Sequence, residues 1–205
     1  YMENMERSEL RFVEVRGAGA NAFVITLNLT HKDPVMRELF QNKDFRIALS
    51  YAINRQEIID VVNLGQGEPW QCAPLPESPL YNEKLAKQYT EYDPDKANQI
   101  LDGIIPKRDA EGFRLRPDGQ PLGIVVEVCS NQQSRIDGLE LVKKYWADVG
   151  IRMEIKAEDR SLFYERKAAN EHDLAVWGGD GGMDVLLEPR WYFPYSHESI
   201  YAIRW

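Results

Sequence analysis

The glycine-rich stretch Trp177–Asp184 carries the side chains best suited to contact a ligand. It follows a short apolar run, Asp173–Trp177, that is typical of a buried strand. Ligands of open α/β sheets collect beyond the carboxyl ends of strands, and glycines let the backbone turn sharply and approach another surface. We therefore expect Trp177, Gly179 and Asp180 of this loop to line a ligand site. The alternative is that Asp180 is only a turn residue of this loop.

Aromatic side chains crowd the end of the sequence. From Trp177 onward they are Trp177, Trp191, Tyr192, Phe193, Tyr195, Tyr201 and Trp205. Such rings stack on sugars and also wall apolar peptide pockets, so Trp191 and Tyr192 are further ligand candidates, as is Trp70 in a proline-rich loop. The alternative is that the C-terminal aromatics belong to a core or to a surface covered by another part of the protein, and that Trp70 anchors its loop.

Enzymatic and metal chemistry are less well supported. Asp180 and Asp184, close to His172 and Asp173, could form the carboxylate pair of a glycoside hydrolase, which needs two acids roughly 5 to 9.5 Å apart. Nothing in the sequence fixes that spacing, and clustered loop acids are usually solvated, so we expect no catalysis. The histidines are dispersed and Asp180–Asp184 lacks the alternating oxygen ligands of a calcium loop, so we expect neither a metal nor a cofactor.

Composition sets broader limits. The 205 residues are 43% hydrophobic and 28% charged, as in a globular protein of one large or two small domains. A net charge of -8 argues against a nucleic-acid partner, which would require basic patches. Cys72 and Cys129 lack the CxxC spacing of a zinc site. They are either two separate buried thiols, which we favour, or a disulfide in an oxidising compartment.

The second half of the chain predicts the elements that position the glycine-rich loop. Apolar patterns indicate strands at 124–129, 151–155 and 173–177, with helices at 135–149 and 162–169 between them. This β-α-β-α-β order implies neighbouring parallel strands joined by right-handed crossovers.

The first half alternates strands, helices and loops. We expect strands at 10–15 and 22–29, the latter buried on both faces because it is rich in Val, Ile and Phe. Prolines make 67–79 an extended loop, and the charged, turn-rich segment 107–119 indicates a surface excursion or hairpin. Between them, Asp93 or Asp95 should cap a helix that runs to about Leu101.

Two helices separated by a break are predicted between Lys43 and Gly67. Apolar residues recur at helical spacing at Phe45, Ala48, Leu49, Ala52 and Ile53. Asn54 followed by Glu57 has the form of a capping box that starts the second helix, and Gly65 provides its C-terminal stop.

This stretch resembles the lobe-building segment of ABC-importer extracellular solute-binding proteins of the dipeptide/oligopeptide/nickel-binding class, family 5. The matching positions are Arg46, Ala48, Leu49, Ala52, Ile53, Asn54, Arg55, Ile58, Gly65 and Gly67. The acid that usually precedes the arginine by about three residues is displaced, with Asp44 only two before Arg46. Later motifs follow in family order at Pro74–Pro76, Tyr92–Ala97, Gly119–Leu122 and Trp146–Ile151. The resemblance covers nearly the whole chain.

The resemblance implies an α/β fold: one lobe of a two-lobed periplasmic-binding-protein type II fold, with a mixed sheet flanked by helices. Residues 1–205 would be the second lobe of a longer protein, with 1–21 and 178–205 approaching a first lobe that is absent. The implied protein is periplasmic or extracellular. It would capture a peptide by lobe closure, without covalent chemistry, and deliver it to an ABC permease in the membrane.

The resemblance also implies a role for two residues of the glycine-rich loop. Peptide-binding members carry Trp-x-x-Asp here, the tryptophan flanking the ligand and the aspartate pairing with the peptide ammonium. Trp177 and Asp180 match this spacing. Those members usually continue with an acid and a proline, whereas this chain continues Gly181–Asp184. Because the family has sugar-binding branches, an oligosaccharide is the alternative ligand.

Overall fold

A computed structural model describes residues 19–179 and 182–205, so the strand expected at 10–15 lies outside the described residues. The elements are β1 (Asn21–Leu27), α1 (Pro34–Gln41), α2 (Lys43–Tyr51), α3 (Arg55–Val62), α4 (Glu83–Lys87), α5 (Pro94–Ile104), β2 (Gly123–Cys129), α6 (Gln133–Asp148), β3 (Arg152–Glu158), α7 (Arg160–Ala168), β4 (Leu174–Gly179) and the 3-10 turn η2 (Pro189–Trp191).

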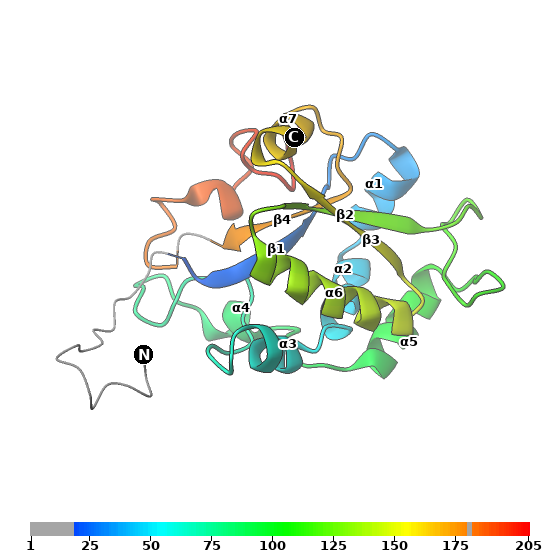
Figure 1. Cartoon of the computed structure of the whole chain (residues 1–205), viewed down its shortest axis with the longest axis horizontal. Coiled ribbons are helices and arrows are strands. Elements are labelled where there is room, and N and C mark those ends of the chain that lie inside the picture. The colour runs from blue at the N-terminus through cyan, green and yellow to red at the C-terminus, as the bar shows by residue number, and fades with distance from the viewer. Residues whose placement is uncertain (1–18, 180–181) are drawn as a thin grey trace.

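The strands form one sheet in the order β1-β4-β2-β3. β2 is parallel to both β3 and β4, whereas β1 is antiparallel to β4. The predicted β-α-β-α-β unit is thereby confirmed. The first crossover runs through α6 from β2 to β3, and the second runs through α7 from β3 back past β2 to β4. Because the two crossovers run in opposite directions across the sheet, α6 and α7 cover opposite faces of it (Figure 1). The α/β class with a mixed sheet flanked by helices is confirmed as well.

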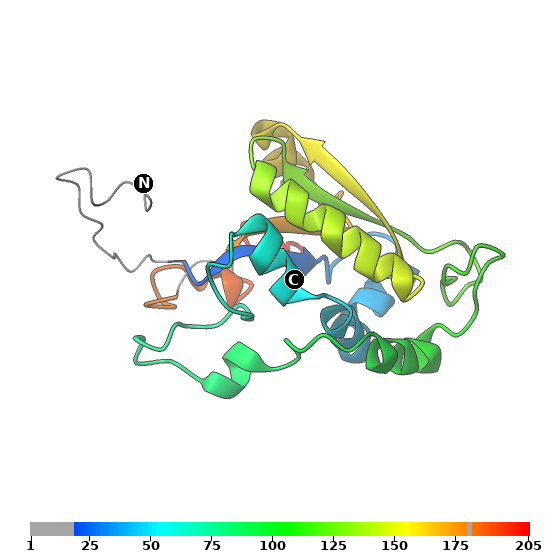
Figure 2. The ribbon, with the colours of Figure 1, turned by 60° about the horizontal axis from the view of Figure 1, so that its bottom comes forward.

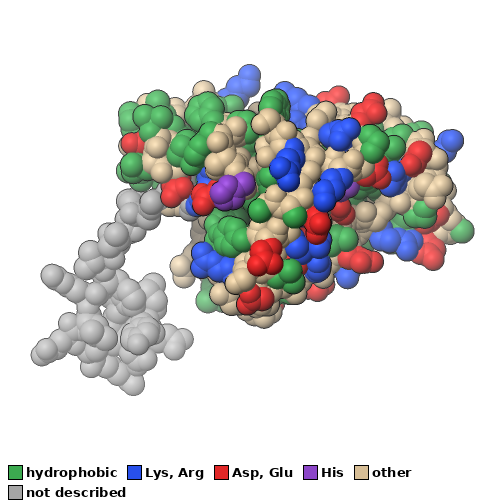
Figure 3. All heavy atoms as spheres, turned by 90° about the horizontal axis from the view of Figure 1, so that it is seen from above, with side chains coloured by type: hydrophobic (Ala, Val, Ile, Leu, Met, Phe, Trp, Pro, Cys, Tyr) green, Lys and Arg blue, Asp and Glu red, His purple; other side chains and the backbone are tan. Residues whose placement is uncertain are grey.

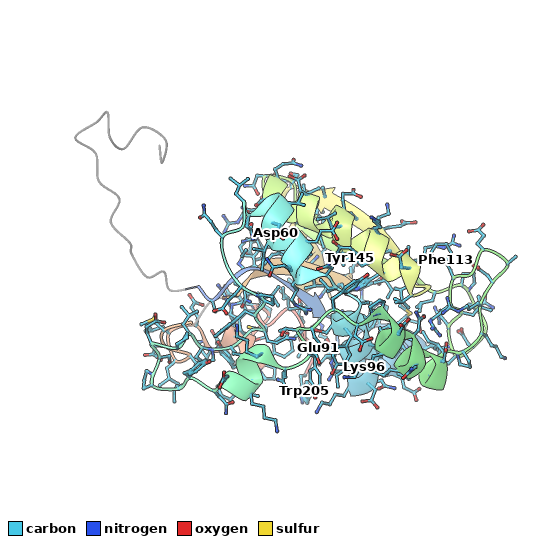
Figure 4. All side chains as sticks on the ribbon, turned by 90° about the horizontal axis from the view of Figure 1, so that it is seen from below. Asp60, Glu91, Lys96, Phe113, Tyr145 and Trp205 are labelled. Carbon is cyan, nitrogen blue, oxygen red and sulfur yellow. The ribbon has the colours of Figure 1, made fainter. Side chains whose placement is uncertain are left out.

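The main core lies between the sheet and the helical layer of α2, α3, α5 and α6 (Figure 2). Trp146 is its largest fully buried side chain, and the indole Nε1–H donates to the Leu49 carbonyl at 3.1 Å. Asp60 on α3 and Tyr145 on α6 mark the neighbouring helices of this layer (Figure 4). No helix among the described residues is both long and apolar enough to cross a membrane.

The predicted helix pair is confirmed as α2 and α3. The Asn54 side chain accepts a hydrogen bond from the Glu57 backbone N–H at 3.2 Å, as an N-cap should. Glu57 in turn accepts from the Asn54 side-chain amide at 3.3 Å. After α3 the chain turns at Gly65, whose φ of 75° lies in the left-handed region that glycine adopts without strain.

One expectation about β1 was wrong. The strand forms at Asn21–Leu27, but only Thr26 within it is buried. The reason is its place at the edge of the sheet, where it pairs with β4 alone among the described residues. A run of Val, Ile and Phe reports strand propensity and does not distinguish a central strand from an edge strand.

The remaining predictions for described residues of the first half are confirmed. Residues 67–79 contain no helix or strand, and Asp93 caps α5 by accepting from the Lys96 N–H at 2.9 Å. Segment 107–121 is a projecting hairpin that carries Phe113 (Figure 4). Arg114 anchors the hairpin: its fully buried guanidinium donates to the carbonyls of Val149 and Ile105 at 2.9 and 3.0 Å.

Candidate ligand-binding site

The end of β4 meets the start of β1 at the carboxyl edge of the parallel strands. Gly179 is paired with Asn21, and a Cβ atom on Gly179 would lie 2.4 Å from the Asn21 Oδ1 atom. Only glycine therefore fits without displacing its neighbour. This close approach gives Gly179, one of the predicted site residues, a structural reason to be glycine.

A backbone hydrogen bond also holds the glycine-rich loop at Gly182. The Leu75 N–H donates to the Gly182 carbonyl at 2.7 Å, which ties the loop to the proline-rich segment 67–79. A Cβ on Gly182 would lie 3.1 Å from both the Ala20 nitrogen and the Leu75 side chain. Asp180 lies outside the described residues, so its direction stays a prediction.

The Trp177 ring packs against two aromatic rings and two guanidinium groups. Its ring lies 5.7 Å from that of Phe163 in a stacked arrangement and 5.5 Å from that of Tyr164, both on α7. The guanidinium carbons of Arg135 and Arg160 lie 5.5 and 5.4 Å from the centre of the indole. Cation–π attraction favours this arrangement, which concentrates positive charge beside Trp177.

A buried ion cluster holds α7 in place. Glu127 of β2 accepts from Arg166 at 2.8 Å and pairs with Lys167, and both the glutamate and the lysine are 1% exposed. Burial alone would raise the pKa of Glu127, but these two cations lower it overall. The carboxylate therefore stays charged and fixes the helix that carries Phe163 and Tyr164.

Trp70 combines the two roles that the sequence left open. Its Nε1–H donates to the Ala73 carbonyl at 3.2 Å, its ring stacks on Tyr81 at 6.0 Å, and the Lys87 ammonium lies 4.4 Å from the ring centre. These contacts anchor the proline-rich loop. The same side chain also lines a cavity of about 680 Å³ between that loop, β1, α2 and α3.

The polar part of this cavity is a chain of hydrogen bonds. Asn21 donates to the Gln71 carbonyl at 3.2 Å, Gln71 to the Ser50 hydroxyl at 3.2 Å, and Arg55 to the same hydroxyl at 2.7 Å. Burial lowers the pKa of Arg55 to about 10. The Asn21 Oδ1 atom is buried and has no hydrogen-bond partner in the part of the chain that the structure describes.

Trp191 and Tyr192 point to different places. Trp191 packs on the small apolar cluster of Cys129, Phe163, Ala175 and Ile200 beneath α7. Tyr192 lines a second cavity of about 500 Å³ between α2, the proline-rich loop and the C-terminal segment. Burial raises the pKa of Tyr192 to about 12, and its hydroxyl has no hydrogen-bond partner within 19–179 and 182–205.

The candidates thus form two groups. Trp177 and Trp191 share the α7 face of the sheet, whereas Trp70 and Tyr192 line separate cavities that meet at Gln71 and Cys72. Sequence reasoning missed Arg135. It lies in the first turn of the helix that follows β2, and that position beyond a strand's carboxyl end could have identified it.

The residues considered for other chemistry have structural partners. Buried His172 binds the Ile200 carbonyl through Nε2 at 2.8 Å, and Asp173 accepts from the Val125 N–H and contacts His31, each at 2.9 Å. Cys72 and Cys129 are separate thiols. No group of three His, Cys, Asp or Glu side chains that could hold a metal occurs in the described ranges.

Comparison with known proteins identifies the scaffold. Residues 3–198 match the family described as bacterial extracellular solute-binding proteins, family 5 Middle. Di/tripeptide-binding protein 1 of Pseudomonas aeruginosa (strain UCBPP-PA14) is 31% identical over 169 residues, which cover 80% of this chain and 28% of that protein. The structure of an oligopeptide-binding protein, OppA, superposes with a TM-score of 0.87 at 40% identity, covering 95% of this chain and 31% of that one.

A third relative was solved with a different class of ligand. A periplasmic oligopeptide-binding protein of Thermotoga maritima, solved with bound mannohexaose, superposes with a TM-score of 0.62 at 25% identity, over 78% of this chain and 30% of that one. The chain spans less than a third of the length of each of these three proteins. The match over nearly all of its residues shows that the chain belongs to the family 5 bacterial extracellular solute-binding proteins.

Proposed function

We propose that this chain is the ligand-binding second lobe of an extracytoplasmic solute-binding protein that captures a peptide and delivers it to an ABC permease. The observation that carries the proposal is the charge arrangement at the end of β4. Two guanidinium groups lie within 5.5 Å of the centre of the Trp177 ring, and an acid, Asp180, follows three residues later. Two cations therefore lie beside the Trp177 ring in space, and an acid follows the same tryptophan closely in the sequence.

This arrangement suits a molecule with a charge of each sign. The Asp180 carboxylate would pair with the peptide α-ammonium, and Arg160 or Arg135 with a carboxylate of the ligand. Arg160 is exposed and forms no ion pair within the described ranges. Charge-assisted hydrogen bonds are about twice as strong as neutral ones, and a closed cleft with little water strengthens them further.

The relatives support a peptide before a sugar. Those named for di/tripeptides and oligopeptides match 80% and 95% of this chain. The mannohexaose complex keeps an oligosaccharide as the second candidate. Sugar rings bind by stacking on an open aromatic face, but Trp177 is already covered by Phe163 and the two guanidinium groups, and Trp191 packs inward.

The surface around the site is suited to contact with the first lobe. Figure 3 shows hydrophobic atoms gathered at one end of the molecule, and several large apolar side chains of the C-terminal segment are exposed. They are Leu186, Leu187, Phe193, Tyr195 and Trp205. We propose that residues 178–205 and 1–21 approach the first lobe. The two lobes would then close on each other at this surface and trap the solute between them without covalent chemistry. The protein would act in the periplasm or at the cell surface.

Titration calorimetry on the complete solute-binding polypeptide that contains this chain tests the proposal. The probes are a free tripeptide and its N-acetylated form. Asp180→Asn should weaken binding of the free tripeptide about 100-fold, because a partner of a desolvated charge pair is lost. The acetylated peptide should bind weakly to the native protein and no more weakly to Asp180→Asn, since the ammonium is already absent.

Asp184→Asn is the matched control, because it removes the neighbouring acid of the same loop and should leave affinity unchanged. Tripeptide binding that survives Asp180→Asn would overturn the peptide assignment. Binding of mannohexaose that is lost in Trp177→Ala but kept in Asp180→Asn would establish the sugar alternative. Steady release of cleaved product from either ligand would show an enzyme instead.

A further inference from the structure

The cavity of about 500 Å³ that Tyr192 lines is separate from the surroundings of Trp177. It is bounded by α2, the proline-rich loop, α4 and the C-terminal segment. Neither Trp177 nor the guanidinium groups of Arg135 and Arg160 line it. Cavities of roughly 300 to 1,000 Å³ that combine apolar walls with a few polar groups commonly bind small molecules. The side chains of the wall therefore indicate what kind of molecule would bind.

The apolar part of this wall is open to solvent. Leu80 and Leu85 are 52% and 50% exposed, and Phe193 of the C-terminal segment is 57% exposed. These three side chains come from separate segments and line one cavity, whereas exposed apolar side chains are normally scattered singly. A ligand with an apolar body would remove them from water, which is favourable.

Hydrogen bonds hold the wall of the cavity in place. The Ser50 hydroxyl on α2 donates to the Tyr89 carbonyl at 2.7 Å, and the Gln71 side-chain amide donates to the Gln88 carbonyl at 2.8 Å. Tyr89 has a φ of 57°, a left-handed conformation that bulky residues rarely adopt. Such a conformation persists only where the surrounding contacts impose it. The cavity is therefore preformed and does not need a ligand to give it shape.

Two cations and no acid are found among the described residues that line the cavity. Lys43 and Arg46 lie three residues apart on α2, so their side chains project from the same face of the helix. Arg46 donates to the Phe40 carbonyl at 2.7 Å, but neither cation forms an ion pair with a carboxylate among residues 19–179 and 182–205. This pairing of cations occurs in a chain with a net charge of -8. Like charges on one helix face repel, and an anion in the cavity would offset that repulsion.

Tyr192 adds a hydrogen-bond donor to the cavity. Its hydroxyl is buried and has no hydrogen-bond partner in the described part of the chain. Burial raises the pKa of Tyr192 to about 12, so the hydroxyl keeps its proton at neutral pH. A buried hydroxyl without a partner is unfavourable, and a carboxylate of a ligand would be a strong acceptor for it.

We propose that this cavity is a second binding site, apart from the peptide site, for a small amphipathic carboxylate. The aliphatic body of the ligand would cover the two exposed leucines and Phe193. Its carboxylate would pair with the two cations of α2 and accept from the Tyr192 hydroxyl. A neutral hydrocarbon would leave that hydroxyl without a partner, and a cationic amphiphile would be repelled. The site does not depend on the peptide assignment, because it uses none of the side chains around Trp177.

Titration calorimetry with decanoate on the complete solute-binding polypeptide that contains this chain tests the site. Decanoate should bind with one-to-one stoichiometry. Decanol has the same aliphatic chain without the charge and should bind about 10-fold more weakly. A saturating tripeptide should leave the affinity for decanoate unchanged, since Trp177, Arg135 and Arg160 do not line the cavity. Decanol binding as tight as that of decanoate, or competition between decanoate and the tripeptide, would overturn the proposal.

Two substitutions locate the bound decanoate. Lys43→Gln removes an exposed cation and should weaken binding about 5-fold. Tyr192→Phe removes only the hydroxyl and should weaken binding about 10-fold. Lys84→Gln is the matched control, because this exposed lysine of α4 does not line the cavity, and it should leave the affinity unchanged.

Two results with these proteins would refute the proposed site. An affinity that is unchanged in both Lys43→Gln and Tyr192→Phe would place decanoate elsewhere. Binding to the 205-residue chain that is absent from the complete polypeptide would show that the first lobe fills the cavity. Asp180→Asn tests the peptide site separately, because it should weaken tripeptide binding and leave decanoate binding unchanged.

Discussion

The buried imidazole of His172 predicts how the stability of this protein depends on pH. His172 is fully buried, its Nε2 lies 2.8 Å from the Ile200 carbonyl, and its Nδ1 has no partner among the described residues. Because a carbonyl only accepts, Nε2 carries a proton, and a second proton on the buried Nδ1 would have no acceptor there, which favours the neutral ring. Burial, and then the charge of Lys167, lower its pKa from 6.5 to about 4.

The direction and the size of the stability change with pH follow from proton linkage. Below pH 6.5 the unfolded chain binds a proton at His172 that the folded protein does not, so stability falls as the pH is lowered towards 4. A full proton difference costs about 1.4 kcal/mol per pH unit, and because the unfolded histidine is only half protonated at pH 6.5, the loss is about 2 kcal/mol of unfolding free energy between pH 6.5 and 4.5. His172→Gln keeps an amide that can donate to the Ile200 carbonyl but does not titrate, so it should lose this component.

His31 and Glu158 also make stability depend on pH in or near this range. Burial lowers the pKa of His31, but its contact with Asp173 raises it overall, so its contribution is present below pH 6.5 and is lost above it. Burial, and the neighbouring Glu127, raise the pKa of Glu158, so that carboxyl opposes His172 within the window. Both effects are common to the native protein and the variant, and the difference between the two proteins isolates His172.

Urea unfolding at half-unit steps from pH 8 to 4.5, followed by far-UV circular dichroism, measures this difference. The stability gap between the native protein and His172→Gln should shift by about 2 kcal/mol between pH 6.5 and 4.5 in favour of the variant. His31→Gln is the matched control, since its effect should fall above pH 6.5. A gap that stays constant from pH 8 to 4.5 would refute the idea that the folded protein holds this imidazole neutral.

Three further substitutions test the contacts around the site. Gly179→Ala should destabilise the protein by about 1–3 kcal/mol through the clash with Asn21, and Asn21→Gly should relieve most of that loss in a thermal melt. Asn54→Ala should cost about 1 kcal/mol as a lost N-cap, measured by urea unfolding, and Asn54→Asp should cost less. Arg114→Met should cost about 1–3 kcal/mol in the same unfolding assay, because it leaves the carbonyls of Val149 and Ile105 without donors, and no loss of stability would contradict this.

Much of the fold was predictable from local pattern. The strand expected at 124–129 forms at Gly123–Cys129, and the helix expected at 135–149 forms at Gln133–Asp148. These elements have strong apolar periodicity and clear end signals, so the sequence within each element specifies it. The membership in family 5, expected from the motif around Arg46, was confirmed by the comparisons.

What the sequence did not reveal depends on residues far apart in the chain. Glu127 interrupts an apolar strand and would be expected to face solvent, yet it is buried against Lys167, 40 residues away. The two guanidinium groups at Trp177 come from two different helices. Local patterns contain no information about such pairings, because the sheet order and the helix placement create them.

The anchoring of the hairpin by Arg114 affects how the molecule comes apart. The hairpin projects from the body (Figure 4), and such a protrusion would ordinarily be an early target for proteases. Releasing it would pull a fully buried guanidinium away from the ends of two helices and leave the carbonyls of Ile105 and Val149 without donors. The hairpin is therefore coupled to the ends of α5 and α6, and its detachment from the body would uncap both helices together.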